Sequence, residues 1–156
     1  MSTGKSYSTG DATLPEKSMN DVEAVVRRFR DAGLKITPQR LSIFELVMKD
    51  RSHPSADDIY RKMLEKHPSI SFTTVYKTLQ TLRDFGQIIE IIIDPERAHY
   101  DPVVTDHYHT FCSKCREIKD FLPNPVTKAV PVGPDNGFMV QSVQVHMKGI
   151  CGHCRD

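Results

Sequence analysis

The sequence has no apolar run that approaches the length of a membrane span, and its formal net charge is only +1. The first absence argues against a membrane partner. The second means that global charge does not indicate nucleic-acid binding, so any basic surface has to be local. Residues 1–20 lack an apolar signal core and are rich in Ser, Thr, Gly and Lys. They predict a flexible tail, and the cytoplasm is the expected location.

Cysteine is absent except in two Cys-x-x-Cys pairs, Cys112/Cys115 and Cys151/Cys154. Two thiolates two residues apart can hold one tetrahedral metal ion from a tight turn, and two such pairs complete a four-sulfur zinc site. The alternatives are coincidental free thiols or a redox dithiol, but a redox dithiol would lie between a strand and a helix, whereas strand-like sequence flanks both pairs here. In a reducing cytoplasm, paired thiols favour metal over disulfides. We therefore predict a structural Zn²⁺ site that clamps two distant strands together.

Residues 21–85 have helical periodicity, with stops and starts that divide them into four helices. Gly33 fits the left-handed residue that ends a first helix. Thr37, followed by proline, predicts the cap of a second helix, and Ser55 with Asp58 resembles the capping box of a third. A fourth helix is capped by Ser71 or Thr73, with its apolar positions turned inward, and ends at Gly86.

The period then changes to that of strands. Residues 87–93 and 98–101 read as a hairpin around a turn at 94–97. Helices followed by a two-stranded wing predict a winged helix-turn-helix domain at 21–101, with a hinge at 102–106. Strands are expected up to Cys112, around 117–121, and from 138 to 146, while the four prolines of 123–137 allow only a short helix. The predicted fold class is α+β, with a small α/β metal-binding domain at 107–156.

The outer face of the expected fourth helix is polar and carries no acid before Asp84. Its side chains can donate to phosphates or reach base edges; they are Thr73, Thr74, Tyr76, Lys77, Thr78, Gln80 and Thr81. Arg40, in the first turn of the second helix, could touch a phosphate beside the helix N-terminus. The alternative is a solvated face on a protein-interaction module. The candidate DNA contacts are Arg40, Thr73, Thr74, Tyr76, Lys77 and Gln80.

A second candidate metal site precedes the first cysteine pair. His107 and His109 project to the same face of an extended strand, where two imidazoles can chelate one ion. Asp101 lies just upstream, and Asp120 lies in the following strand. His109 alternates away from Cys112, which favours a site separate from the zinc. The alternative is two exposed histidines on a polar strand. The other histidines lack such a constellation, and two of them, His67 and His99, are expected at the surface.

Several motifs occur in an order that resembles a known family. They are residues 33–40 (Gly-Leu-Lys-Ile-Thr-Pro-Gln-Arg), 53–60 (His-Pro-Ser-Ala-Asp-Asp-Ile-Tyr), 73–76 (Thr-Thr-Val-Tyr), 106–109 (Asp-His-Tyr-His) and both cysteine pairs. Over residues 21–154 the chain resembles the ferric uptake regulator (Fur) family of bacterial metal-dependent repressors, and within it the peroxide-sensing, PerR-like branch. That branch binds its regulatory metal through three His and two Asp. The resemblance implies an Fe²⁺ or Mn²⁺ site formed by His53, Asp101, His107, His109 and Asp120.

Two departures from the iron-sensing branch stand out. Tyr108 occupies the place of an acid between the two histidines, and Val143 occupies the place of a further histidine, with His146 at another phase of the strand. The third metal site of that branch is therefore expected to be absent. The proline-rich segment at 123–137 also replaces a longer helix that the family places against the dimer interface.

The resemblance also implies a function. The chain would be a homodimer that represses transcription at a double-stranded DNA operator, with residues 107–156 as the dimerisation domain. Its small-molecule partners would be the metal ion and hydrogen peroxide, whose reaction at bound iron would oxidise His53 or His107. A regulator of iron, manganese or zinc uptake, with the same residues and no peroxide chemistry, is the main alternative. A metallohydrolase is more remote, because five protein ligands leave little room for substrate and no general base is evident.

Overall fold

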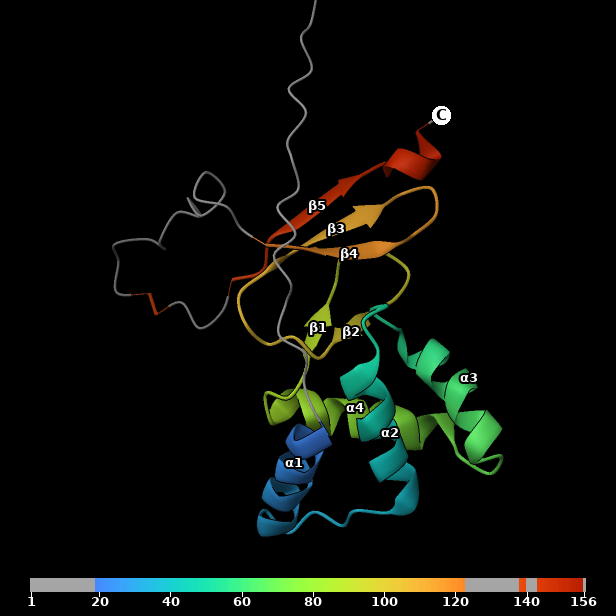
Figure 1. Cartoon of the computed structure of the whole chain (residues 1–156), viewed down its shortest axis with the longest axis vertical. Helices are drawn as coiled ribbons and strands as arrows, with labels where there is room; N and C mark the ends of the chain where they lie inside the picture. Colours follow the sequence, from blue (N-terminus) through green and yellow to red (C-terminus); the bar gives the residue numbers. More distant parts are fainter. Residues whose placement is uncertain (1–18, 123–137, 140–142, 156) are drawn as a thin grey trace, which may run out of the picture.

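Helices, a hairpin and a small sheet follow one another along the chain. The computed structural model describes residues 19–122, 138, 139 and 143–155. The helices are α1 (Met19–Asp31), α2 (Pro38–Lys49), α3 (Ala56–Lys66) and α4 (Phe72–Asp84). The hairpin pairs β1 (Ile89–Ile91) with β2 (His99–Asp101), and the sheet holds β3 (Tyr108–Cys112), β4 (Ile118–Phe121) and β5 (His146–Gly149) before the short 3-10 helix η1 (Gly152–Cys154). The hairpin lies between the helices and the three-stranded sheet (Figure 1).

Local signals set the helix ends where the sequence predicts them. Gly33 has φ +76°, a conformation that costs glycine little, and α1 ends just before it. The side chain of Thr37 accepts a backbone N–H at the start of α2. Ser55 and Asp58 form the predicted capping box, and Ser71, one of the two expected residues, caps α4. No helix in the described part of the chain is long and apolar enough to cross a membrane.

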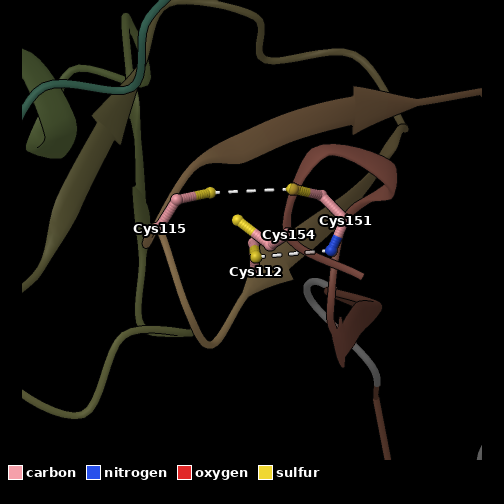
Figure 2. Close-up of side chains that lie close together, drawn as sticks. All are labelled: Cys112, Cys115, Cys151 and Cys154. Carbon is pink, nitrogen blue, oxygen red and sulfur yellow. Dashed lines mark hydrogen bonds between the residues drawn. The ribbon is translucent and has the colours of Figure 1, made fainter. Parts of the chain in front are cut away.

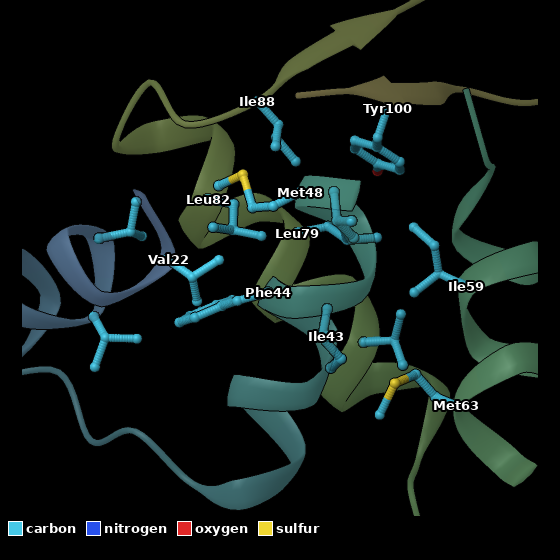
Figure 3. Packing of buried hydrophobic residues seen from close by; sticks show 14 of the residues in the cluster. Val22, Ile43, Phe44, Met48, Ile59, Met63, Leu79, Leu82, Ile88 and Tyr100 are labelled. Atoms are coloured by element: carbon cyan, nitrogen blue, oxygen red, sulfur yellow. The ribbon is translucent and has the colours of Figure 1, made fainter. Parts of the chain in front are cut away.

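One apolar core joins the helices to the hairpin. Phe44 of α2 and Leu79 of α4 are fully buried at its centre, and Tyr100 of β2 packs against the same cluster (Figure 3). Burying one such side chain contributes roughly 1.5–3 kcal/mol, so the helices and the hairpin stabilise each other. Because Tyr100 faces the core, its neighbours His99 and Asp101 face the opposite way along β2.

The three-stranded sheet has the order β4-β3-β5, with β4 antiparallel and β5 parallel to β3. His109 of β3 pairs with Asp120 on one side and with His146 on the other. The strand predicted at 138–146 is wrong for residues 138, 139 and 143–145, because β5 begins at His146, where β3 offers a pairing partner; residues 140–142 lie outside the described part of the chain. The proline-rich segment at 123–137 and the tail at 1–18 lie outside the described residues.

Candidate metal centres and DNA interface

The four cysteines meet at one end of the sheet. Cys112 ends β3, Cys115 follows in the turn to β4, Cys151 directly precedes η1, and Cys154 is the last residue of η1 (Figure 2). The parallel pairing of β3 with β5 brings the two pairs together, and all four Sγ atoms lie within 4.8 Å of one another. A tetrahedral zinc site with Zn–S distances of about 2.3 Å has sulfur atoms about 3.8 Å apart. The Sγ atoms of Cys115 and Cys151 are 3.7 Å apart.

The electrostatics of these thiols fit a bound cation. The backbone N–H of Cys151 donates to Cys112 and, together with the backbone of Cys115 and Lys114, lowers the pKa of that thiol to about 6. The neighbouring thiols, that of Cys151 first, raise the pKa of Cys154 to about 12. Four thiolates at this spacing repel one another, so they can all ionise only with a positive ion between them. The donor set and the spacing both fit a closed, structural Zn²⁺ site.

A separate cluster of His and Asp lies between the helical half and the sheet. One ligand atom each from His53, Asp101, His109 and Asp120 lies within 4.8 Å of the others. Nε2 of His53 is 2.6 Å from Oδ1 of Asp120, and Nε2 of His109 is 3.3 Å from Oδ2 of Asp101. These residues come from the α2–α3 loop, β2, β3 and β4, so the structure assembles groups up to 67 positions apart.

His107 borders this four-residue set. Its Nε2 lies 2.7 Å from Oδ2 of Asp101, 2.9 Å from Nε2 of His109 and 3.5 Å from Oδ1 of Asp120. The structure thus brings all five residues implied by the family resemblance into one buried region. His107 and His109 also share a face, as their spacing predicts.

Two carboxylates, the buried Asp101 and the half-buried Asp120, dominate the charge of the His/Asp cluster. Burial raises the pKa of Asp101, but hydrogen bonds with His107 and His109 outweigh it and lower that pKa to about 2. The pKa of Asp120 is likewise lowered, chiefly by His107 and His53 against the effect of burial. In turn, burial lowers the pKa of His107, while Asp101 and Asp120 raise it to about 10. A histidine proton supplies the positive charge here, and a divalent cation with mixed N and O ligands would replace it.

The other histidines differ from the sequence-based expectation. His99 was expected at the surface, but it is buried, with Nδ1 2.6 Å from the carbonyl oxygen of His53. The alternation of β2 could have shown this, because a core-facing Tyr100 places His99 on the same face as Asp101. His67 is half-buried, and its Nε2 lies 2.9 Å from Oγ of Ser42. His146 belongs to neither ligand cluster of the described residues, although its ring centroid lies 5.7 Å from that of His109.

The candidate DNA contacts differ in how accessible they are. On α4, Thr73, Tyr76 and Lys77 are exposed, while Thr74 and Gln80 are half-buried. The expectation that Thr78 shares this outer face is wrong: it is 1% exposed, and its hydroxyl donates to the carbonyl of Thr74 at 2.6 Å. The half-buried Arg40 donates to the carbonyl of Lys35 at 2.8 Å, so the guanidinium already has a partner.

A helical unit with a wing, joined to a sheet that carries two metal-ligand clusters, defines the class of metal-responsive transcription regulators. The chain belongs to the ferric uptake regulator family, whose model matches residues 31–148. Membership confirms the predicted family and α+β fold class. It also places the chain among regulators rather than enzymes, so the metallohydrolase alternative is set aside.

Individual relatives refine this placement. The chain is 31% identical to the peroxide operon regulator of Bacillus subtilis, over 86% of this chain and 94% of that protein. The Helicobacter pylori ferric uptake regulator matches with a TM-score of 0.74 at 19% identity, over 92% of this chain and 98% of that one, which shows the fold. PerR from Streptococcus pyogenes, described as a peroxide sensor, matches with a TM-score of 0.50 at 32% identity, over 86% and 92%.

Proposed function

We propose that this chain is a metal-dependent repressor that binds a double-stranded DNA operator as a homodimer and responds to hydrogen peroxide in the cytoplasm. One observation carries the proposal: the His/Asp cluster draws on both halves of the molecule. His53 belongs to the helical half and Asp120 to the sheet, and their side chains are 2.6 Å apart. Asp101, at the end of β2, lies between them in the chain.

The two clusters take different ions in this proposal. The four cysteines hold a permanent Zn²⁺, because their closed sulfur set leaves no open position. The His/Asp cluster holds an exchangeable Fe²⁺ or Mn²⁺, which mixed nitrogen and oxygen ligands suit. Residues 21–101 would then form the DNA-binding domain, 102–106 the hinge and 107–156 the dimerisation domain, with 1–20 as a tail.

Closure of the cluster would control DNA binding through geometry. Drawing His53 towards Asp120 fixes the angle between the helices and the sheet. In a dimer this angle sets the distance between the two α4 helices, which has to match half-sites about one helical turn, or a multiple of it, apart. The ion is therefore an allosteric ligand of the DNA-competent state. Thr73, Tyr76 and Lys77, exposed on α4, are the strongest candidates for contact with DNA, whereas Arg40 would first have to leave the carbonyl of Lys35.

The response to peroxide would act on the same ligands. Bound iron(II) supplies the electron transfer that activates hydrogen peroxide. His53 or His107 would gain one oxygen atom, and the second oxygen of the peroxide would leave as water. An oxidised imidazole is a poorer ligand, so the link between the two halves opens. The 31% sequence identity between this chain and the peroxide operon regulator of Bacillus subtilis supports this function.

The test compares iron-loaded and manganese-loaded protein. Protein purified without oxygen, with its zinc counted, is loaded with either ion and bound to duplexes selected from a random library. We expect peroxide to release the iron form from DNA and to add one oxygen to a peptide containing His53 or His107, while the manganese form is unchanged. An iron form that stays unmodified and keeps its DNA affinity would refute peroxide sensing.

A metal-uptake regulator is the second candidate, and one comparison favours it. The ferric uptake regulator of Francisella tularensis, determined with iron, matches with a TM-score of 0.68 at 26% identity, above the 0.50 found for Streptococcus pyogenes PerR. In that case DNA binding would follow the concentration of the metal and ignore peroxide. Replacing Asp120 with Glu keeps the charge and shifts the reach of the ligand. If this variant responded to peroxide as the wild type does, the exact reach of this ligand would not matter for oxidation.

A further inference from the structure

A buried acid, Asp94, stands outside both metal-ligand clusters and connects them. It lies in the β1–β2 turn, is only 3% exposed, and accepts the backbone N–H of Glu96 at 2.9 Å. The imidazole of His99 and the guanidinium of Arg116 both contact the same carboxylate. Burial raises the pKa of Asp94, but these three contacts outweigh it and lower the pKa to about 2. The carboxylate is therefore ionised and fully engaged.

His99 extends this contact to the ligand His53. Its Nε2 lies 3.2 Å from Oδ2 of Asp94, and its Nδ1 lies 2.6 Å from the carbonyl oxygen of His53. A carbonyl oxygen can only accept, so Nδ1 is the donor. Next to it, the backbone N–H of Tyr100 donates to the carbonyl of Pro54 at 3.0 Å, which fastens the same loop to β2.

The backbone of His53 needs such support. Its φ of +53° lies in the left-handed region, which is uncommon for residues other than glycine. A conformation of this kind persists only where the surroundings determine it. Here the surroundings aim Nε2 of His53 at Asp120, so the hydrogen bond from His99 helps to pre-position a ligand.

Arg116 brings the cysteine turn into the same chain of contacts. It directly follows Cys115, has φ +65°, and its backbone N–H donates to the carbonyl of Cys112 at 2.8 Å. Its guanidinium pairs with Asp94 and, at 3.0 Å, with Oε1 of Glu96. The turn that bears two sulfur ligands is thus joined to the turn of the β1–β2 hairpin.

We infer that Arg116, Asp94 and His99 are positioning residues that couple the cysteine cluster to the His/Asp cluster by holding the backbone of His53. This inference rests on the proposed metal binding of the His/Asp cluster. Outer partners of ligand residues commonly contribute about 10–100-fold to metal affinity. The zinc turn would therefore set the affinity for the exchangeable ion without touching it.

The experiment measures the Mn²⁺ dissociation constant of the zinc-containing protein from the electron paramagnetic resonance signal of free Mn²⁺. The zinc content and the melting temperature of each variant are measured as well. We expect Asp94→Asn and His99→Leu to raise the dissociation constant about 10–100-fold at an unchanged zinc count. Arg116→Ala should act in the same direction, because it removes the side chain that pairs with Asp94 while the backbone cost of the positive φ stays similar. Arg97→Ala is the matched control: this exposed neighbour reaches Asp94 only at 3.9 Å, and we expect a change within about twofold.

The variant His99→Asn separates positioning from packing. The amide nitrogen of asparagine takes the place of Nδ1 and can still donate to the carbonyl of His53, so much of the affinity should return relative to His99→Leu. A merely structural role would lower the melting temperature of both variants and leave Mn²⁺ affinity unchanged. Equal affinities for wild type, His99→Asn and His99→Leu would overturn the inference, even if Asp94→Asn failed to fold. If His109→Ala bound Mn²⁺ as well as wild type, the metal site itself would be refuted instead.

Discussion

The cysteine cluster and the His/Asp cluster both border the same small sheet, yet they differ in burial and in the origin of their residues. The cysteines all come from residues 112–154, and Cys115 is exposed. The His/Asp residues come from both halves, and His53, Asp101 and His109 are at most 3% exposed. The first cluster can hold only its own half together. The second can report the angle between the halves, which is what a switch requires.

The same contrast runs through the two halves as a whole. The helical half has a continuous apolar core and carries its stability in packed side chains. Among the described residues of the sheet, Phe111, Cys112 and Ile118 are the buried apolar side chains. So small a core cannot stabilise three short strands, so a metal cross-link is expected to contribute most of the stability.

Loss of the zinc site should have the largest effect. In Cys151→Ser we expect the zinc content to fall from about one ion per chain to almost none, because structural sites need all four ligands. Apparent binding energies of such sites are on the order of 10 kcal/mol, so the sheet should unfold while the helices persist. Metal counting and circular dichroism measure both effects, with His153→Ala, exposed in the same turn, as the control. A folded, zinc-free sheet would remove the basis of the comparison.

Loss of one acid from the His/Asp cluster should strongly weaken Mn²⁺ binding without unfolding either half. Asp101→Asn keeps the shape but removes a buried negative charge, and we expect Mn²⁺ affinity to fall by more than about 100-fold. Zinc content should remain unchanged. The exposed Asp106 provides the control substitution, Asp106→Asn. Equal Mn²⁺ affinity in both variants, measured by titration, would show that the buried acid is no ligand.

The His/Asp cluster should make both the stability and the Mn²⁺ affinity of the protein depend on pH. Asp101 and Asp120 raise the pKa of His107 from 6.5 to about 10 in the metal-free site. A raised folded-state pKa contributes stability that is full below pH 6.5 and is lost as pH rises towards 10. The free energy of unfolding without Mn²⁺ should therefore fall over this range, while Mn²⁺ affinity rises because the metal takes the deprotonated imidazole. Denaturant titrations of wild type and His107→Gln at several pH values measure this, and parallel curves would contradict it.

The smallest effect should come from helix capping, which is local to the helical half. Ser55→Ala removes the side chain that accepts the backbone N–H of Asp58, and we expect the free energy of unfolding to fall by about 1 kcal/mol. Thr37→Ala, at a cap without a reciprocal partner, should cost less. Zinc content should be the same in both variants. Urea denaturation gives the ranking, and a larger loss at Thr37 would refute it.

Local rules allowed the sequence alone to predict much of this protein. The glycine stop at Gly33, the caps at Thr37 and Ser55, and the two cysteine pairs depend on residues a few positions apart, so their geometry follows from backbone chemistry. The α+β class and the separation of the zinc site from the histidines followed from periodicity. The position of β5 did not, because a strand begins where its neighbour offers hydrogen bonds.

Contacts between distant segments were decided only by the tertiary structure. Spacing could join His107 to His109, but His53 lies 67 positions from Asp120, and only the family resemblance pointed to it. The alternation of β2 could have indicated the burial of His99. The pairing of Arg116 with Asp94 had no local signal, because it arises where the hairpin meets the zinc turn. Composition and periodicity determine which elements form. Packing of one half against the other determines which polar groups share a site, and here that packing brings His53 to Asp120.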